Sequence, residues 1–212
     1  MSRRAEVILV NLICFGPFAA RSILGLIEHK ESLSFDDRGA LILIAVEILC
    51  GGAAALLLRR RGWSFPAFGL RPTMAQTVGG MLLLIGTYIF VGGFYDLVRS
   101  LTNSNPAAAV TSNASITLPV LIALTFINPL YDELFLVAYN LEAARDDGAF
   151  FAITLSAFVR FLCHLEQGPV AALTILPLGL LFAAVYWRWR VLWPLVVAHG
   201  VMDFMGYVSE LR

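Results

Sequence analysis

Two adjacent carboxylates, Asp132 and Glu133, lie inside a hydrophobic run from about Leu118 to Ala138. An ionised carboxylate at bilayer depth costs about 2.5 to 3.5 kcal/mol by insertion scales. Acids at this depth therefore need partners or a chemical task, such as the removal of a proton from water by a general base. This acid pair is the first candidate for a catalytic site.

Candidate partners for the acids occur in two later apolar segments. Arg160 and His164 are four residues apart, and so are His199 and Asp203. Side chains at this spacing lie on one face of a helix. The two adjacent acids instead point about 100° apart. One acid can therefore face a cavity while the other holds a neighbouring helix.

The composition indicates a membrane protein. Of 212 residues, 59% are hydrophobic and 14% are charged, and the mean hydropathy is +0.79. Soluble domains carry about 25% charged residues. The 15 Lys and Arg residues balance 15 Asp and Glu residues, which argues against a nucleic-acid partner. Cys14, Cys50 and Cys163 stand singly in apolar segments, so we expect them to be reduced.

The hydropathy pattern predicts an all-α, polytopic transmembrane helical bundle with about seven spans. A span needs roughly 17 to 25 residues, and seven segments exceed or approach this length. They are Ala5–Leu26, Gly39–Leu58, Gln76–Val98, Ile116–Ala144, Ala149–Leu165, Val170–Trp187 and Val191–Val208. Glu47 lies in the middle of the second segment, where it either pairs with Arg21 or faces a wet interior.

The distribution of basic residues predicts the orientation. With the N-terminus in the cytoplasm, the inner segments contain nine arginines and the outer segments contain four basic residues. Because cytoplasmic loops are enriched in Lys and Arg, we expect an integral membrane protein, in the cell membrane, with a cytoplasmic N-terminus. The inner set is Arg3, Arg4, Arg59, Arg60, Arg61, Arg71, Arg145, Arg188 and Arg190, and the outer set is Lys30, Arg38, Arg99 and Arg212.

Three predicted spans bring ionisable groups to a similar depth. Counting the helical rise from the cytoplasmic ends places Asp132, Arg160 and His164 at roughly 14, 16 and 22 Å. The same count places His199 and Asp203 at roughly 12 and 18 Å. These groups form either a catalytic centre or a structural polar network that links the helices.

The three groups resemble motifs of the CPBP family of intramembrane proteases, which includes the type II CAAX prenyl endopeptidases and bacteriocin-processing and abortive-infection relatives. The family carries Glu-Glu-x-x-x-Arg, Phe-x-x-x-His and His-x-x-x-Asn or Asp, in that order. Asp132 and Glu133 match the paired acids, His164 matches the second motif, and His199 with Asp203 matches the third. The resemblance covers residues 63–207, the family-like core of a single integral membrane domain, 1–212.

The sequence departs from the family motifs at three positions. Asp132 replaces the first Glu, Val137 replaces the motif's Arg, and Arg160 replaces the motif's Phe. One hypothesis is compensation, in which Arg160 supplies the guanidinium that orients the acids and contacts Glu133 or Asp132. The alternatives are that Arg160 binds only backbone carbonyls or extends to the headgroups, or that the centre has decayed and the protein is an inactive binding or scaffold protein.

The resemblance implies an intramembrane endopeptidase that acts on a membrane-associated peptide or protein. It implies that Asp132 and His164 activate water, that His199 stabilises the oxyanion and that Asp203 orients His199, with Glu133 in support. No cofactor is expected, although zinc held by His164, His199 and carboxylates is a rival mechanism. A transporter with the same groups as a proton relay is disfavoured because the chain shows no internal repeat.

Overall fold

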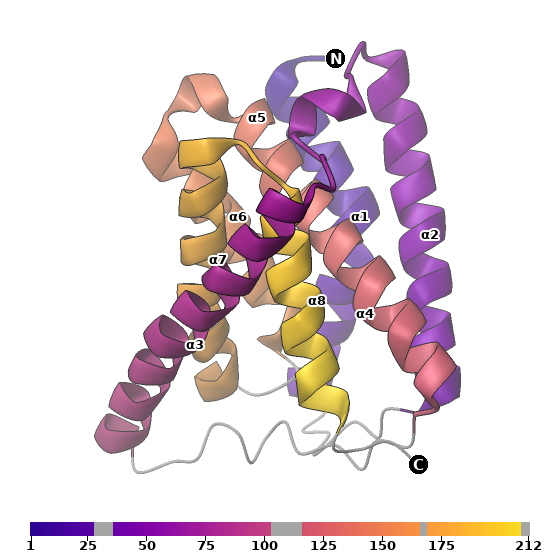
Figure 1. Cartoon of the computed structure of the whole chain (residues 1–212). Helices are drawn as coiled ribbons and strands as arrows, with labels where there is room; N and C mark the ends of the chain where they lie inside the picture. Colours follow the sequence, from indigo (N-terminus) through magenta and orange to yellow (C-terminus); the bar gives the residue numbers. More distant parts are fainter. Residues whose placement is uncertain (28–35, 103–115, 166–168, 209–212) are drawn as a thin grey trace.

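A computed structural model describes residues 1–27, 36–102, 116–165 and 169–208 of the chain as a bundle of helices (Figure 1). The predicted all-α helical bundle is confirmed, and each of the seven predicted segments is helical. The elements are α1 (Arg3–Ile27), α2 (Asp37–Arg60), η1 (Phe65–Phe68), α3 (Met74–Thr102), α4 (Leu118–Asp132), η3 (Glu133–Tyr139), α5 (Asn140–Ala143), η4 (Arg145–Asp147), α6 (Ala149–Cys163), α7 (Pro169–Trp189) and α8 (Trp193–Tyr207).

Five helical stretches are long and apolar enough to cross a membrane. These are α1, α2, α3, the continuous stretch from Leu118 to Ala143, and α7 from Ala172 to Trp189. Helices α6 and α8 have 15 residues each, or about 22 Å at the helical rise. They are shorter than the roughly 30 Å hydrocarbon core of a bilayer. By length and composition, the protein is therefore an integral membrane protein with five helical stretches long enough to span the bilayer and two shorter helices, of which α6 is apolar.

The nine arginines assigned to the inner segments gather at one end of the bundle. They flank the start of α1 and the end of α2, precede α3, follow α5 and close α7. In Figure 1 these helix ends lie together at the top, and α8 runs from there toward the opposite end. This arrangement agrees with the charge count, and the cytoplasmic location of this end stays a prediction.

A buried carboxylate ties α1 to the segment after α2 at this end. Glu6 is 1% exposed and accepts hydrogen bonds from Arg61 Nε at 2.8 Å and Trp63 Nε1 at 2.7 Å. Arg3 Nη1 donates a third bond at 3.1 Å. Because buried charges need partners, this fully bonded Glu6 is explained as a structural anchor.

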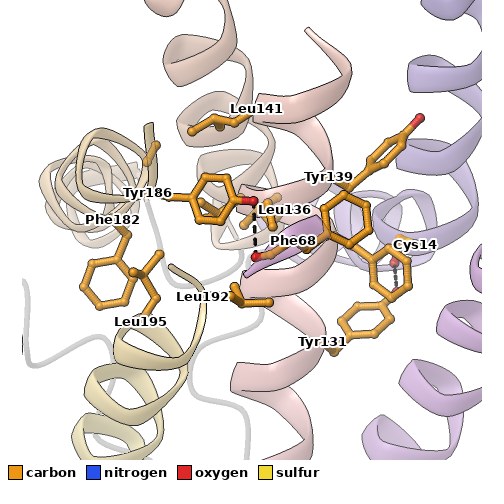
Figure 2. Packing of buried hydrophobic residues seen from close by; sticks show 14 of the residues in the cluster. Cys14, Phe68, Tyr131, Leu136, Tyr139, Leu141, Phe182, Tyr186, Leu192 and Leu195 are labelled. Atoms are coloured by element: carbon orange, nitrogen blue, oxygen red, sulfur yellow. Dashed lines mark hydrogen bonds between the residues drawn. The ribbon is translucent and has the colours of Figure 1, made fainter. Parts of the chain in front are cut away.

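The helix formed by α4, η3 and α5 is the centre of the bundle. Six of the seven residues of η3 are buried, and a helix that is buried all round lies in the core. Figure 2 shows Leu136, Tyr139 and Leu141 of this helix among side chains of the surrounding elements. Tyr131 donates a hydrogen bond to the Cys14 carbonyl at 2.6 Å, which fixes α1 against the central helix.

Close packing of α8 against α4 gives a first prediction. A Cβ atom added at Gly200 would lie 2.5 Å from the Thr125 carbonyl oxygen. Because this neighbour is backbone, Gly200→Ala should separate the two helices and lower the free energy of unfolding by about 1 to 3 kcal/mol. Gly206→Ala is the matched control on the same helix, since it meets nothing within 4 Å. Equal unfolding free energies for both variants in detergent would contradict this packing.

Candidate active site

The acid pair lies where the central helix changes geometry. Asp132 is the last residue of α4, and Glu133 is the first residue of η3, which is a π-helix. Pro129 lies inside α4 one turn earlier, where proline removes a backbone donor and clashes with the preceding turn. Short π-helical turns are frequent at functional sites. The local distortion therefore coincides with the two residues that the motifs single out.

Glu133 is the hub of the polar cluster. Its Oε1 accepts a hydrogen bond from Arg160 Nη2 at 2.7 Å and lies 2.7 Å from His199 Nδ1. The Glu133 side chain is 0% exposed, and its Oε2 has no hydrogen-bond partner among the described residues. Charge-assisted contacts of this length are strong and directional. One carboxylate thereby joins the central helix to α6 and α8.

Arg160 makes the contact with the acid pair that the sequence predicted. Its guanidinium pairs with Glu133 at 2.7 Å and lies 3.8 Å from Asp132 Oδ2. Arg160 is 1% exposed, so the alternative that it extends to the headgroups is wrong. A Cβ atom at Gly179 of α7 would lie 3.3 Å from Arg160 Cδ, so the glycine leaves room for the stem. Equivalence of Arg160 to the motif's missing Arg stays a prediction.

His199 lies between two carboxylates. Its Nδ1 faces Glu133, and its Nε2 lies 3.5 Å from Asp203 Oδ2. The predicted contact between Asp203 and His199 is present, but Glu133 makes the shorter contact with the ring. Because the bond at Nδ1 fixes the ring, Nε2 is the atom available to a substrate on the Asp203 side.

His164 is bonded to the backbone. It is the C-cap residue of α6, and its Nδ1 lies 2.8 Å from the Arg160 carbonyl oxygen. A carbonyl only accepts, so Nδ1 carries the proton and Nε2 keeps a lone pair, the state of a general base. Among the described residues, no direct hydrogen bond joins His164 to Asp132 or Glu133. The predicted cooperation of His164 with Asp132 therefore requires a bridging water and stays a prediction.

The cluster has a buried part and an accessible part. Glu133 and Arg160 are sealed from solvent, whereas the Asp132 and Asp203 side chains keep 16% and 23% of their area exposed. His164 is half-buried. The accessible groups can thus meet water or a substrate while the sealed groups hold them in place. A preorganised site divides in this way into groups that contact a ligand and groups that hold them in place.

The donor set does not form a metal site in the arrangement described. Nowhere in the described ranges do three or more His, Cys, Asp or Glu side chains group as metal ligands. The Arg160 cation also occupies the position beside both acids, and a second cation there would be repelled. Zinc held by His164, His199 and carboxylates stays an untested alternative.

A second polar contact, which the sequence analysis did not anticipate, adjoins the acid pair. Glu47 of α2 accepts a hydrogen bond from Asn128 Nδ2 at 2.5 Å. Of the two alternatives for Glu47, a partner on α1 or an inward position, the structure shows the inward one. Asn128 precedes Asp132 by four residues. The signal in the sequence was an amide one turn before a buried acid, but its partner on α2 lies 81 positions away.

The fold and the cluster together define a helical integral membrane protein with a buried centre of ionisable groups. Residues 114–205 match the family model described as type II CAAX prenyl endopeptidase Rce1-like, and this range contains all three motifs. The match confirms the motif resemblance to the CPBP family over residues 114–205, and the matched family is one of membrane endopeptidases. No curated protein and no solved structure gave a significant match to the chain.

Proposed function

We propose that the protein is an intramembrane endopeptidase that hydrolyses a peptide bond of a membrane-associated substrate. The observation that carries this proposal is the bonding of Glu133 to both Arg160 and His199 beside a partly exposed Asp132. A network made only to link helices would not need an accessible carboxylate at its edge. The family match supports the same reaction class.

In the proposed reaction, Asp132 acts with His164 as the general base. The base takes a proton from water, and the water oxygen forms a bond to the scissile carbonyl carbon. His199, as the imidazolium that the neighbouring carboxylates of Glu133 and Asp203 favour, donates a hydrogen bond from Nε2 to the resulting oxyanion. This bond is worth most in a dry site. The C–N bond then breaks, and the abstracted proton passes to the leaving nitrogen. Water thus supplies the hydroxyl of the new acid and the hydrogen of the new amine.

The sealed groups keep the reacting groups in the required states. Arg160 balances the charge of Glu133, which would be costly unpaired in an apolar core. Glu133 in turn holds His199 at Nδ1, so that Nε2 points toward the Asp203 side. Removal of either support should therefore disturb the orientation of the oxyanion donor. We also propose that the arginine-rich end lies in the cytoplasm and that the protein resides in the cell membrane.

The test is peptide cleavage by the purified full-length protein in liposomes. A farnesylated CAAX-type peptide with a fluorophore and a quencher on either side of the cleavage site is the first substrate to try, since it fits the family's description. We expect cleavage that requires both Asp132 and His199 and that resists 1,10-phenanthroline. No cleavage of this or any unprenylated membrane peptide would favour the inactive scaffold. Inhibition by the chelator, reversed by zinc, would favour metal catalysis.

A further inference from the structure

Asn128 differs from the amide pair Asn11 and Asn140 because most of its hydrogen-bonding capacity is unused. Asn11 and Asn140 bond each other in both directions, at 2.7 and 3.0 Å, and so join α1 to α5. Among the described residues, the Asn128 side chain makes one hydrogen bond, from its Nδ2 to Glu47. Its amide oxygen and second N–H have no partner among the described residues. The first pair is a closed helix contact, whereas the second is open on one side.

Asn128 lies one helical turn before Asp132 on the central helix. Asn128 and Asp132 stand four residues apart on α4, hence on one helix face. Asn128 is half-buried, as are Asp132 and Asp203. Glu47, by contrast, is 2% exposed, so the Asn128 amide is hydrogen-bonded on its buried side. Asn128 therefore shares a face of α4 with Asp132, and both side chains remain partly exposed.

Glu47 is suited to hold Asn128 without adding charge to the site. It lies in the middle of the membrane-spanning α2, and no ion pair reaches it within the part of the chain that the structure describes. A buried carboxyl group without a cation remains neutral by keeping its proton. Its Oε1 serves as acceptor for Asn128 in this state, while its buried Oε2 has no partner among the described residues.

We propose that Asn128, held by Glu47, is a substrate-binding subsite that hydrogen-bonds one peptide unit of the substrate backbone. A side-chain amide has one acceptor and one free donor here, and a peptide unit offers the complementary pair. The proposal rests on the proposed protease function and identifies which part of the substrate is bound and by what.

The spacing fixes which peptide unit is bound. Four residues of helix rise about 6 Å, and two residues of extended peptide span about 6.6 Å. A substrate that lies extended along α4 with its scissile bond at Asp132 therefore places the peptide unit two residues away at Asn128. Recognition through the backbone constrains the conformation of the substrate and leaves its side chains free to vary.

The test separates binding from catalysis in the full-length protein in liposomes, with the fluorogenic peptide described above. Asn128→Leu should raise KM roughly fivefold to thirtyfold, as for one to two lost hydrogen bonds, with kcat nearly unchanged. Glu47→Leu should raise KM similarly, the double variant should be no worse than Asn128→Leu, and Glu47→Gln should resemble wild type. Asn11→Leu, which removes the closed amide pair, is the control and should leave KM unchanged.

A substrate series tests the same contact without altering the fold. One peptide is N-methylated two residues before the cleavage site, and a second is N-methylated two residues after it. Wild type should show a raised KM for only one of the two peptides. Asn128→Leu should not discriminate at that position. An unchanged KM in Asn128→Leu, or equal penalties for both enzymes at every methylated position, would overturn the subsite.

Failure of the proposed protease function gives a different result from failure of the Asn128 subsite. If wild type cleaves nothing, the binding of the same labelled peptide is measured by fluorescence anisotropy. A weaker affinity of Asn128→Leu than of wild type, with Asn11→Leu unaffected, would support the subsite in a non-catalytic protein. Equal affinities of all three would overturn it.

Discussion

Asp132→Asn should lower kcat for peptide cleavage by roughly 10²- to 10⁴-fold, the usual contribution of a general base. The amide has almost the same shape as the carboxylate but cannot accept a proton from water. The side chain is partly exposed and lies 3.8 Å from Arg160 rather than in its close pair. We therefore expect the thermal unfolding temperature to stay close to that of wild type.

Two further variants control for charge and shape at the site. Asp132→Glu restores the residue of the family motif and should keep measurable activity, because the carboxylate is retained. Asp203→Asn should also keep activity, because the third motif of the family accepts either residue. Rates are compared in liposomes at matched protein amounts. An Asp132→Asn enzyme as fast as wild type would remove Asp132 from the mechanism and leave Glu133 as the base.

The sequence could predict the helices because each apolar segment is bounded by charged or turn-forming residues. The helix of α2, for example, begins after Asp36, whose side chain caps Gly39, and its last turn contains Arg59 and Arg60. The contact of Arg160 with the acids was also predictable. An arginine buried at this depth has few possible counter-charges, and the acid pair is at the same level.

Other features depend on three-dimensional packing and have weak sequence signals. The π-helix of η3 begins at Glu133, which bonds side chains of α6 and α8, and no residue type requires that geometry. The role of Glu133 as hub was underestimated because spacing cannot tell which of two adjacent acids is sealed. The bond between Glu47 and Asn128 joins helices distant in the chain. His164 was predicted inside the helix Ala149–Leu165, but α6 ends at Cys163 and His164 caps it with its ring bonded to the backbone.

The compensation hypothesis makes a prediction about a pair of substitutions. Arg160→Phe restores the residue of the second family motif but leaves Glu133 without its cation in a site that excludes water. Breaking a buried pair by removing one partner costs about 3 to 5 kcal/mol. We expect a loss of this order in the free energy of unfolding, together with a large fall in activity as the His199 ring loses its fixed neighbour.

An exposed arginine provides the matched control. Arg4 pairs with Asp147 at 3.1 Å, but its side chain is 85% exposed, and exposed pairs contribute little to stability. Arg4→Phe should therefore leave the unfolding transition nearly unchanged. Comparable losses in both variants would indicate that the aromatic side chain, and not the missing charge, is responsible.

The substitution Val137→Arg distinguishes compensation by Arg160 from a decayed active centre. Val137 is fully buried and occupies the position of the motif's Arg, four residues after Glu133. Val137→Arg alone should destabilise the protein, because two guanidiniums would then compete for the acids in a filled core. Combined with Arg160→Phe, Val137→Arg should restore much of the lost stability and activity, because it places a guanidinium one helical turn from Glu133. The measurement is a double-mutant cycle of unfolding free energy and kcat. Additive losses would show that the two positions are not equivalent and that Arg160 is a new structural element of this chain.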